Sequence, residues 1–201
     1  MGAIKKKIKR VKIERKKLHS SAKAAVRLIR AVEKEFDFKS GVKNIVVRKP
    51  KGDETDYGQY HGKSYWFIRN RISVPAYPAR SVDLKEYIYH ELGHAIHDHF
   101  DITDYLSPFI NKVITVQKEY VAASKKAVNW NRLPNFVNGY ARTCREEDFC
   151  ETLAAYLCNR ATWQKRIKYA GYDFRVKKNS KLMEKLDAVD ELLKDLHTFD
   201  W

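Results

Sequence analysis

The stretch His90-Glu91-Leu92-Gly93-His94 has the spacing H-E-x-x-H, and it constrains this chain more than any other feature. Residues four apart on a helix lie on the same face, so His90 and His94 can offer two imidazole nitrogens to one zinc ion. Glu91 lies at the neighbouring edge of that face, where its carboxylate can take a proton from a zinc-bound water. The stretch therefore predicts a zinc site in a helix, although such a string also arises by chance in some long helices.

The residues around the motif favour the helix. Asp83 and Glu86 have the spacing of a capping box. Apolar residues recur at helical spacing through the segment, at Leu84, Tyr87, Ile88, Leu92, Ala95 and Ile96. Gly93 is the exception, because glycine costs about 1 kcal/mol in a helix interior. A glycine between two ligand histidines makes sense if another part of the molecule approaches the backbone closely there.

Two further histidines, His97 and His99, follow the motif. Metzincins place a third ligand histidine six residues after the second, with a glycine between them to turn the chain. Here the sixth residue is Phe100, and His97 occupies the glycine position. The metzincin pattern is therefore absent, and we expect His97 and His99 at the surface or beside the ligands.

A second informative stretch is Gly139-Tyr140-Ala141-Arg142-Thr143-Cys144-Arg145-Glu146-Glu147-Asp148-Phe149-Cys150-Glu151. Thr143 and Glu146 have capping-box spacing, which predicts a helix start. Glu147 and Glu151 are four apart on that helix, and a carboxylate pair on an otherwise apolar helix is costly unless a cation faces it. Acidic residues that complement the helix dipole would account for the first turn but not for Glu151. A zinc site with two histidines needs one more protein ligand and a water.

The order of elements predicts an α+β protein that is mostly helical, with a small mixed sheet packed on the active-site helices. Strands are expected at residues 42–48, 64–69 and 72–74, with a turn-rich loop over residues 49–62. Helices are expected at about residues 4–38 (broken near 19–21), from 84, and at 107–129, 143–160 and 180–196. Residues 163–174 resemble a basic aromatic connector. The last helix is expected to close the core and to carry no chemistry.

The charge is large and uneven, with a formal net value of +15. Between Lys5 and Arg30 the chain has twelve lysines or arginines against one acid, Glu14. We expect residues 1–20 to form a basic arm or helix and residues 21–201 to form one domain. Residues 1–30 are a candidate surface for nucleic acid, an acidic partner or an anionic membrane, with a merely solvated helix as the alternative.

Cysteine usage and hydropathy point to a cytoplasmic protein. Cys144, Cys150 and Cys158 are odd in number and form no C-x-x-C pair. The N-terminus has no apolar core of a signal peptide, and no apolar run has transmembrane length. We expect a cytoplasmic location, which includes action in a host cell or a phage particle. Cys144 and Cys150 are expected to be small packing residues rather than redox-sensitive groups.

The two stretches together resemble a known family. H-E-L-G-H followed by Y-A-R-T-x-x-x-E-x-F-x-E-T is similar to gluzincin zinc metallopeptidases, and most of all to the catalytic domain of anthrax lethal factor and its Pro-Pro endopeptidase relatives. That group includes many small phage and bacterial proteins. The resemblance covers residues 84–156 and implies a zincin-like fold. Asp148 and Cys150 stand where the family often has Phe and Ala, and the first 40 residues match nothing in it.

The resemblance also implies roles for individual residues. It implies Glu147 as the third zinc ligand and Glu151 as a carboxylate that orients a ligand histidine. It implies that Tyr140 donates its hydroxyl to the developing oxyanion. Zn²⁺ is the expected cofactor, and a protein or peptide is the expected substrate.

The leading functional hypothesis is a zinc-dependent endopeptidase that hydrolyses peptide bonds with a zinc-bound water activated by Glu91. Tyr140 argues against a related type of bacterial metallopeptidase that clears repressors or antitoxins. The alternative hypothesis is a basic, nucleic-acid-associated protein with a structural or inactive zinc site. The sequence contains no groove-reading motif, so sequence-specific binding is not expected.

Overall fold

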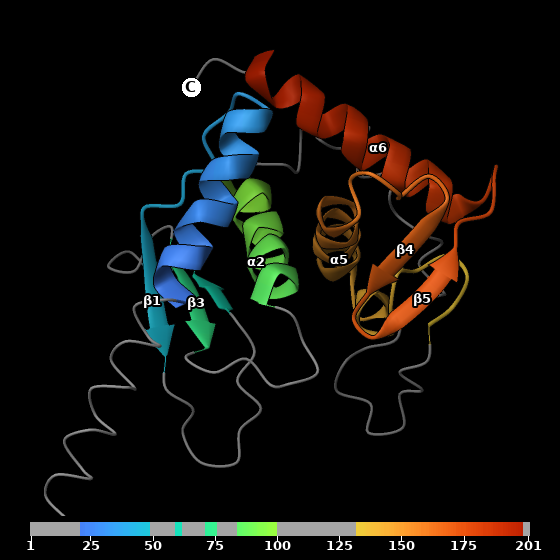
Figure 1. The fold of residues 1–201 in the computed structure, drawn as a ribbon, viewed down its shortest axis with the longest axis horizontal. Coiled ribbons are helices and arrows are strands. Elements are labelled where there is room, and N and C mark those ends of the chain that lie inside the picture. The colour runs from blue at the N-terminus through green and yellow to red at the C-terminus, as the bar shows by residue number, and fades with distance from the viewer. Residues whose placement is uncertain (1–20, 49–58, 62–70, 76–83, 100–131, 199–201) are drawn as a thin grey trace, which may run out of the picture.

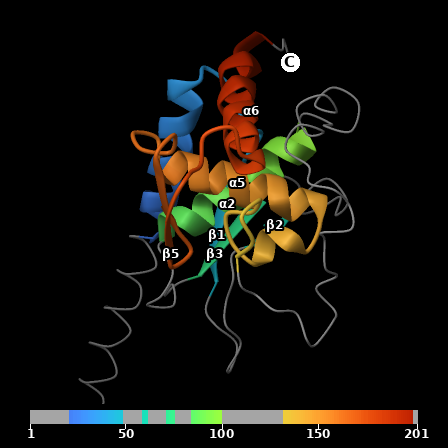
Figure 2. The same ribbon diagram turned by 90° about the vertical axis from the view of Figure 1, so that its right-hand side faces the viewer.

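The computed structural model describes residues 21–48, 59–61, 71–75, 84–99 and 132–198. The fold is α+β, mostly helical with small sheets, as predicted. Helices α2 (Leu84–His99) and α5 (Arg145–Cys158) pack side by side at the centre (Figures 1 and 2). A three-stranded sheet contacts α2 on one side, and a two-stranded hairpin contacts α5 on the other. Helix α6 (Lys181–Asp195) packs across α5, and a short 3-10 helix, η3 (Leu196–Thr198), follows it.

The three-stranded sheet has the strand order β1-β3-β2. Strand β1 (Asn44–Arg48) runs parallel to β3 (Arg71–Pro75), and β2 (Gln59–His61) runs antiparallel to β3. The predictions of β1 and β3 are confirmed, but the prediction of a loop over residues 49–62 is wrong at β2. Only three residues lie between Gly58 and Gly62, too few for a period-2 pattern to be recognised in the sequence. The strand forms because these residues pair with β3. The strand predicted at residues 64–69 and the helix predicted at 107–129 lie outside the described residues.

The helix that covers residues 21–35, drawn in blue in Figure 1, buries its apolar side in the core. The buried residues of that side are Ala25, Ile29, Val32 and Phe36, which agrees with helical periodicity. Glu33 is also buried, because its Oε1 accepts hydrogen bonds from the Ser40 backbone N–H at 3.0 Å and from the Ser40 hydroxyl at 2.7 Å. These bonds fix the chain as it leaves the helix and turns toward β1.

Residues 166–175 form a hairpin, so the prediction of a connector over residues 163–174 is wrong. Strand β4 (Arg166–Tyr169) pairs antiparallel with β5 (Tyr172–Arg175). Ala170 and Gly171 join them with φ values of 48° and 77°, which suits the two-residue turns that match the twist of a hairpin. The Ala170 backbone N–H donates to Glu86 Oε1 at 3.1 Å, which ties the turn to α2. Without Asn-Gly or Asp-Gly at the turn, this segment lacks the strongest sequence signal of a hairpin.

Helix α6 closes the core, as predicted, and it carries one buried charge that periodicity does not reveal. Lys185 Nζ lies 2.6 Å from Asp148 Oδ2 on α5, and both residues are fully buried. Lys185 also lies 4.4 Å from the centre of the Phe136 ring. A buried ion pair is tolerated only when its charges are matched, so these contacts explain why Asp148 sits in the core. None of the helices in the described part of the chain has the length and apolarity needed to cross a bilayer.

Candidate metal centre

Gly93 lets the two central helices come together at the motif. A Cβ atom built on Gly93 would lie 2.9 Å from Cys150 Cα and 3.1 Å from Cys150 Cβ and Sγ. Real Cβ atoms do not approach a backbone atom so closely, so only glycine fits here without a shift of α2 or α5. The expected close approach at Gly93 is confirmed, and the approaching segment is α5. Cys150 is fully buried at this contact.

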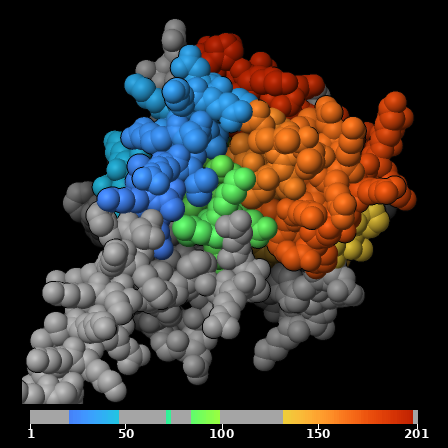
Figure 3. Space-filling view, in the orientation of Figure 1, coloured from blue at the N-terminus to red at the C-terminus, as the bar shows by residue number. Residues whose placement is uncertain are grey.

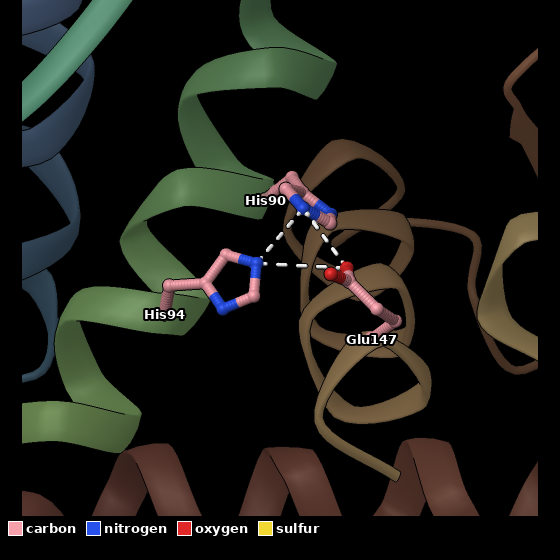
Figure 4. Close-up of side chains that lie close together, drawn as sticks. All are labelled: His90, His94 and Glu147. Carbon is pink, nitrogen blue, oxygen red and sulfur yellow. Dashed lines mark hydrogen bonds and ion pairs between the residues drawn. The ribbon is translucent and has the colours of Figure 1, made fainter. Parts of the chain in front are cut away.

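Three side chains converge between α2 and α5 (Figure 4). His90 Nε2 and His94 Nε2 are 3.1 Å apart. Glu147 Oε2 lies 3.3 Å from His90 Nε2 and 3.5 Å from His94 Nε2. These residues form the one set of three or more potential metal ligands found among the described residues.

The donor set fits a zinc ion. Tetrahedral zinc with bonds of about 2.0–2.1 Å holds neighbouring donor atoms about 3.4 Å apart, close to the three distances between these atoms. Glu147 Oε2 is also a buried oxygen that makes no hydrogen bond within the described part of the chain. Two imidazoles and one carboxylate are the ligand types of zinc sites that keep a position open. Three lone-pair donors that point at one spot are stabilised when a cation occupies it.

His90 is held from behind by a chain of contacts. Its Nδ1 lies 2.8 Å from Glu151 Oε1. The other oxygen of Glu151 accepts a hydrogen bond from Asn138 Nδ2, and Asn138 Oδ1 accepts one from the Ala141 backbone N–H at 2.8 Å. The Tyr169 side chain of β4 also hydrogen-bonds to Glu151. Ala141 belongs to the 3-10 helix η2 (Tyr140–Arg142). The Glu151 carboxylate is therefore contacted by α2, by β4 and by the loop before η2, and η2 in turn holds that loop residue.

The Nδ1 side of His94 faces α5. Its Nδ1 lies 3.0 Å from Glu146 Oε1, and its side chain also hydrogen-bonds to Cys150. Burial alone would lower the pKa of His94, but the contacts with Cys150, Glu146 and Glu147 outweigh burial and raise it. The capping box predicted for Thr143 and Glu146 is therefore wrong. Cys144 is the N-cap of α5, and it makes no side-chain capping bond.

A family described as "Putative zinc-binding metallo-peptidase" matches the chain over residues 70–201. The chain belongs to this family. The matched part includes the H-E-x-x-H stretch and the whole of α5. No curated protein and no solved structure matches the chain. The family supports a zinc-dependent peptidase in general. The closer likeness to the lethal factor catalytic domain stays a prediction.

The two other residues predicted to act at this site are Tyr140 and Glu91. Tyr140 is 42% exposed, and its hydroxyl donates to Glu147 Oε1 at 3.2 Å. Burial, and then Glu147, raise the pKa of Tyr140 above its ordinary value. Glu91 is 3% exposed and follows His90 directly on α2. Burial lowers the pKa of His90, but Glu151 and Glu91 outweigh burial and raise it.

His97 is not part of the group formed by His90, His94 and Glu147, which we call the metal cluster. It lies on α2 beyond His94, with its ring centre 6.2 Å from that of Phe149. Burial lowers its pKa, consistent with a neutral imidazole packed against the core. The side chain of His99 lies outside the described part of the structure.

Three residues of the metallopeptidase site are not predicted by the sequence: Asn138, Glu146 and Tyr169. Asn138 stands two residues before Tyr140, and nothing in the pattern separates it from the surrounding loop. The spacing favours helix capping for Glu146, and Tyr169 falls in the expected connector. One signal is available for Glu146, because it stands next to Glu147 and five residues before Glu151 on the same helix.

Proposed function

We propose that this protein is a zinc-dependent endopeptidase of the gluzincin type, with a zincin-like fold similar to that of the lethal factor and Pro-Pro endopeptidase group. The observation that carries the proposal is the convergence of His90 Nε2, His94 Nε2 and Glu147 Oε2 between two packed helices. His90, His94 and Glu147 would hold the ion. Membership of a zinc-binding metallopeptidase family supports the reaction class.

Bound zinc would supply Lewis-acid chemistry, lowering the pKa of a water and polarising the peptide carbonyl. Glu91 takes a proton from the attacking water and later gives it to the leaving amine. Its position directly after His90 on α2 supports this role. Tyr140 donates its hydroxyl hydrogen to the oxyanion that develops on the carbonyl oxygen. Its exposed position next to Glu147 supports this role, since it faces both the ligands and the solvent.

Removal of metal tests this function. A quenched-fluorescence library of mixed peptide sequences is the probe, because it assumes no substrate. We expect cleavage by the purified full chain to disappear after treatment with a strong chelator and to return when zinc is added back. Magnesium added at the same concentration is the control, and it should restore nothing, because it prefers oxygen ligands in octahedral geometry. Undiminished cleavage by metal-free protein would contradict the proposal.

A second candidate function is nucleic-acid binding, and one feature of the described surface favours it. Lys23, Arg27, Arg30 and Lys34 are all exposed along the helix that covers residues 21–35, which lies on the face seen in Figure 3. Their spacing of four, three and four residues puts them in one row, with charges about 4.5–6 Å apart along the helix axis. The regular phosphates of a nucleic acid would match such a row. The apolar side of this helix is buried in the core, so it cannot insert into a membrane.

A charge-matched pair of variants tests the second function. One variant replaces Lys23, Arg27, Arg30 and Lys34 with Gln, and the control replaces four exposed residues of the hairpin region with Gln: Lys165, Arg175, Lys177 and Lys178. The probe is random-sequence duplex DNA over a range of salt concentrations. We expect the helix variant alone to reduce the dependence of log K on log salt, by about 0.9 for each phosphate that is no longer neutralised. Equal weakening in both variants would attribute binding to net charge and would exclude this surface.

A further inference from the structure

Helix α5 provides a separate carboxylate to each histidine of the metal cluster. His90 and His94 both turn Nε2 toward Glu147 Oε2, so Nδ1 of each ring faces away from the cluster (Figure 4). Nδ1 of His90 lies 2.8 Å from Glu151 Oε1, and Nδ1 of His94 lies 3.0 Å from Glu146 Oε1. The resemblance to gluzincins implied only the first of these two contacts.

We propose that Glu146 is a positioning residue that orients His94 for metal binding. It would do for His94 what Glu151 does for His90. This inference rests on the metal site of the proposed function. A carboxylate that accepts from Nδ1–H keeps the hydrogen on that nitrogen and leaves the lone pair of Nε2 directed at the metal. It also holds the plane of the ring, so less rotational freedom is lost when the ion binds.

The geometry is specific to His94 rather than to the start of the helix. An acidic residue in the first turn would interact favourably with the helix dipole in any side-chain orientation. In a capping box the Glu146 carboxylate would turn back to the backbone N–H of the N-cap. Instead its Oε1 lies within hydrogen-bond distance of an imidazole nitrogen 52 positions away in the chain. The orientation of this carboxylate is therefore explained by the histidine.

The two carboxylates differ in their surroundings, which predicts different strengths. Glu151 is 7% exposed and is fixed by Asn138 and Tyr169. The side chain of Glu146 is 51% exposed, so water competes for its oxygen atoms. We expect Glu146 to contribute less to metal affinity than Glu151, near the lower end of the roughly 10–100-fold range of such partners.

Zinc affinity of the full chain tests the proposal, measured by competition with a chromophoric chelator. We expect Glu146→Ala to lower the affinity by about 10-fold and Glu146→Gln to recover most of it, because an amide oxygen still accepts from Nδ1–H. The visible spectrum of the cobalt-substituted protein should change in Glu146→Ala, since the orientation of a ligand has changed. Thermal unfolding of the metal-free proteins shows whether a loss of affinity reflects a loss of fold.

Glu184→Ala is the matched control. Glu184 is an exposed acid in the first turn of α6, so its removal has the same effect on a helix dipole without touching the metal cluster. Wild-type zinc affinity in Glu146→Ala, or an equal loss in Glu184→Ala, would overturn the positioning role. These outcomes differ from a failure of the proposed function, in which the wild-type chain itself would bind no zinc or cleave no peptide.

Discussion

Glu91→Gln should abolish peptide cleavage and leave zinc binding intact. Glutamine has nearly the same shape as glutamate and can occupy the same buried position, where the Glu91 side chain is 3% exposed. It cannot take a proton at neutral pH, so the attacking water loses its base and the leaving amine loses its acid. We expect kcat to fall by about 10²–10⁴-fold, the contribution of a general acid–base group.

The measurement combines steady-state cleavage of the peptide library with zinc content on the same preparations. Glu184→Gln is the control, because Glu184 is exposed on α6 and contacts Lys181 rather than the metal cluster. It should match the wild type in both measurements. Cleavage by Glu91→Gln within a few-fold of wild type would exclude Glu91 as the base.

The sequence predicts those parts of the site that a single helix defines. His90 and His94 share a helix face because of their spacing, and no tertiary information is needed to pair them. Gly93 indicates a close approach of backbone for the same local reason. The position of Glu147 opposite them cannot be derived in this way, because it depends on how α2 packs against α5. Only the resemblance to a known family implies Glu147 in advance.

The parts that the sequence does not predict depend on contacts between distant segments. Tyr169 reaches Glu151 only because residues 166–175 form a hairpin against α5, and the turn lacks the residues that mark most hairpins. Lys185 pairs with Asp148 across the α5–α6 contact. Lys185 lies on the buried side of an amphipathic helix, where it interrupts the apolar pattern. Periodicity does not predict this position, because it cannot tell which charge another element will neutralise.

Glu147→Ala should have the largest effect on metal binding. The substitution removes the oxygen that lies 3.3 and 3.5 Å from the two imidazole nitrogens and leaves a site of two neutral donors. Because Glu147 would bind the metal directly, its removal should lower zinc affinity by more than the roughly 10–100-fold typical of residues that only orient a ligand. The hydroxyl of Tyr140, which donates to Glu147 Oε1, should also lose its fixed position. Glu184→Ala is again the control, and it should bind zinc as the wild type does.

Metal content is the most direct measurement of the central claim. The wild-type chain and Glu147→Ala are purified in parallel without chelator, and their bound metals are determined by elemental analysis. The account predicts about one zinc ion per wild-type chain and a large loss of zinc in the variant, as expected for a site with three protein ligands. Full retention of zinc by Glu147→Ala, or wild-type protein without zinc, would contradict the assignment of His90, His94 and Glu147 as the zinc site.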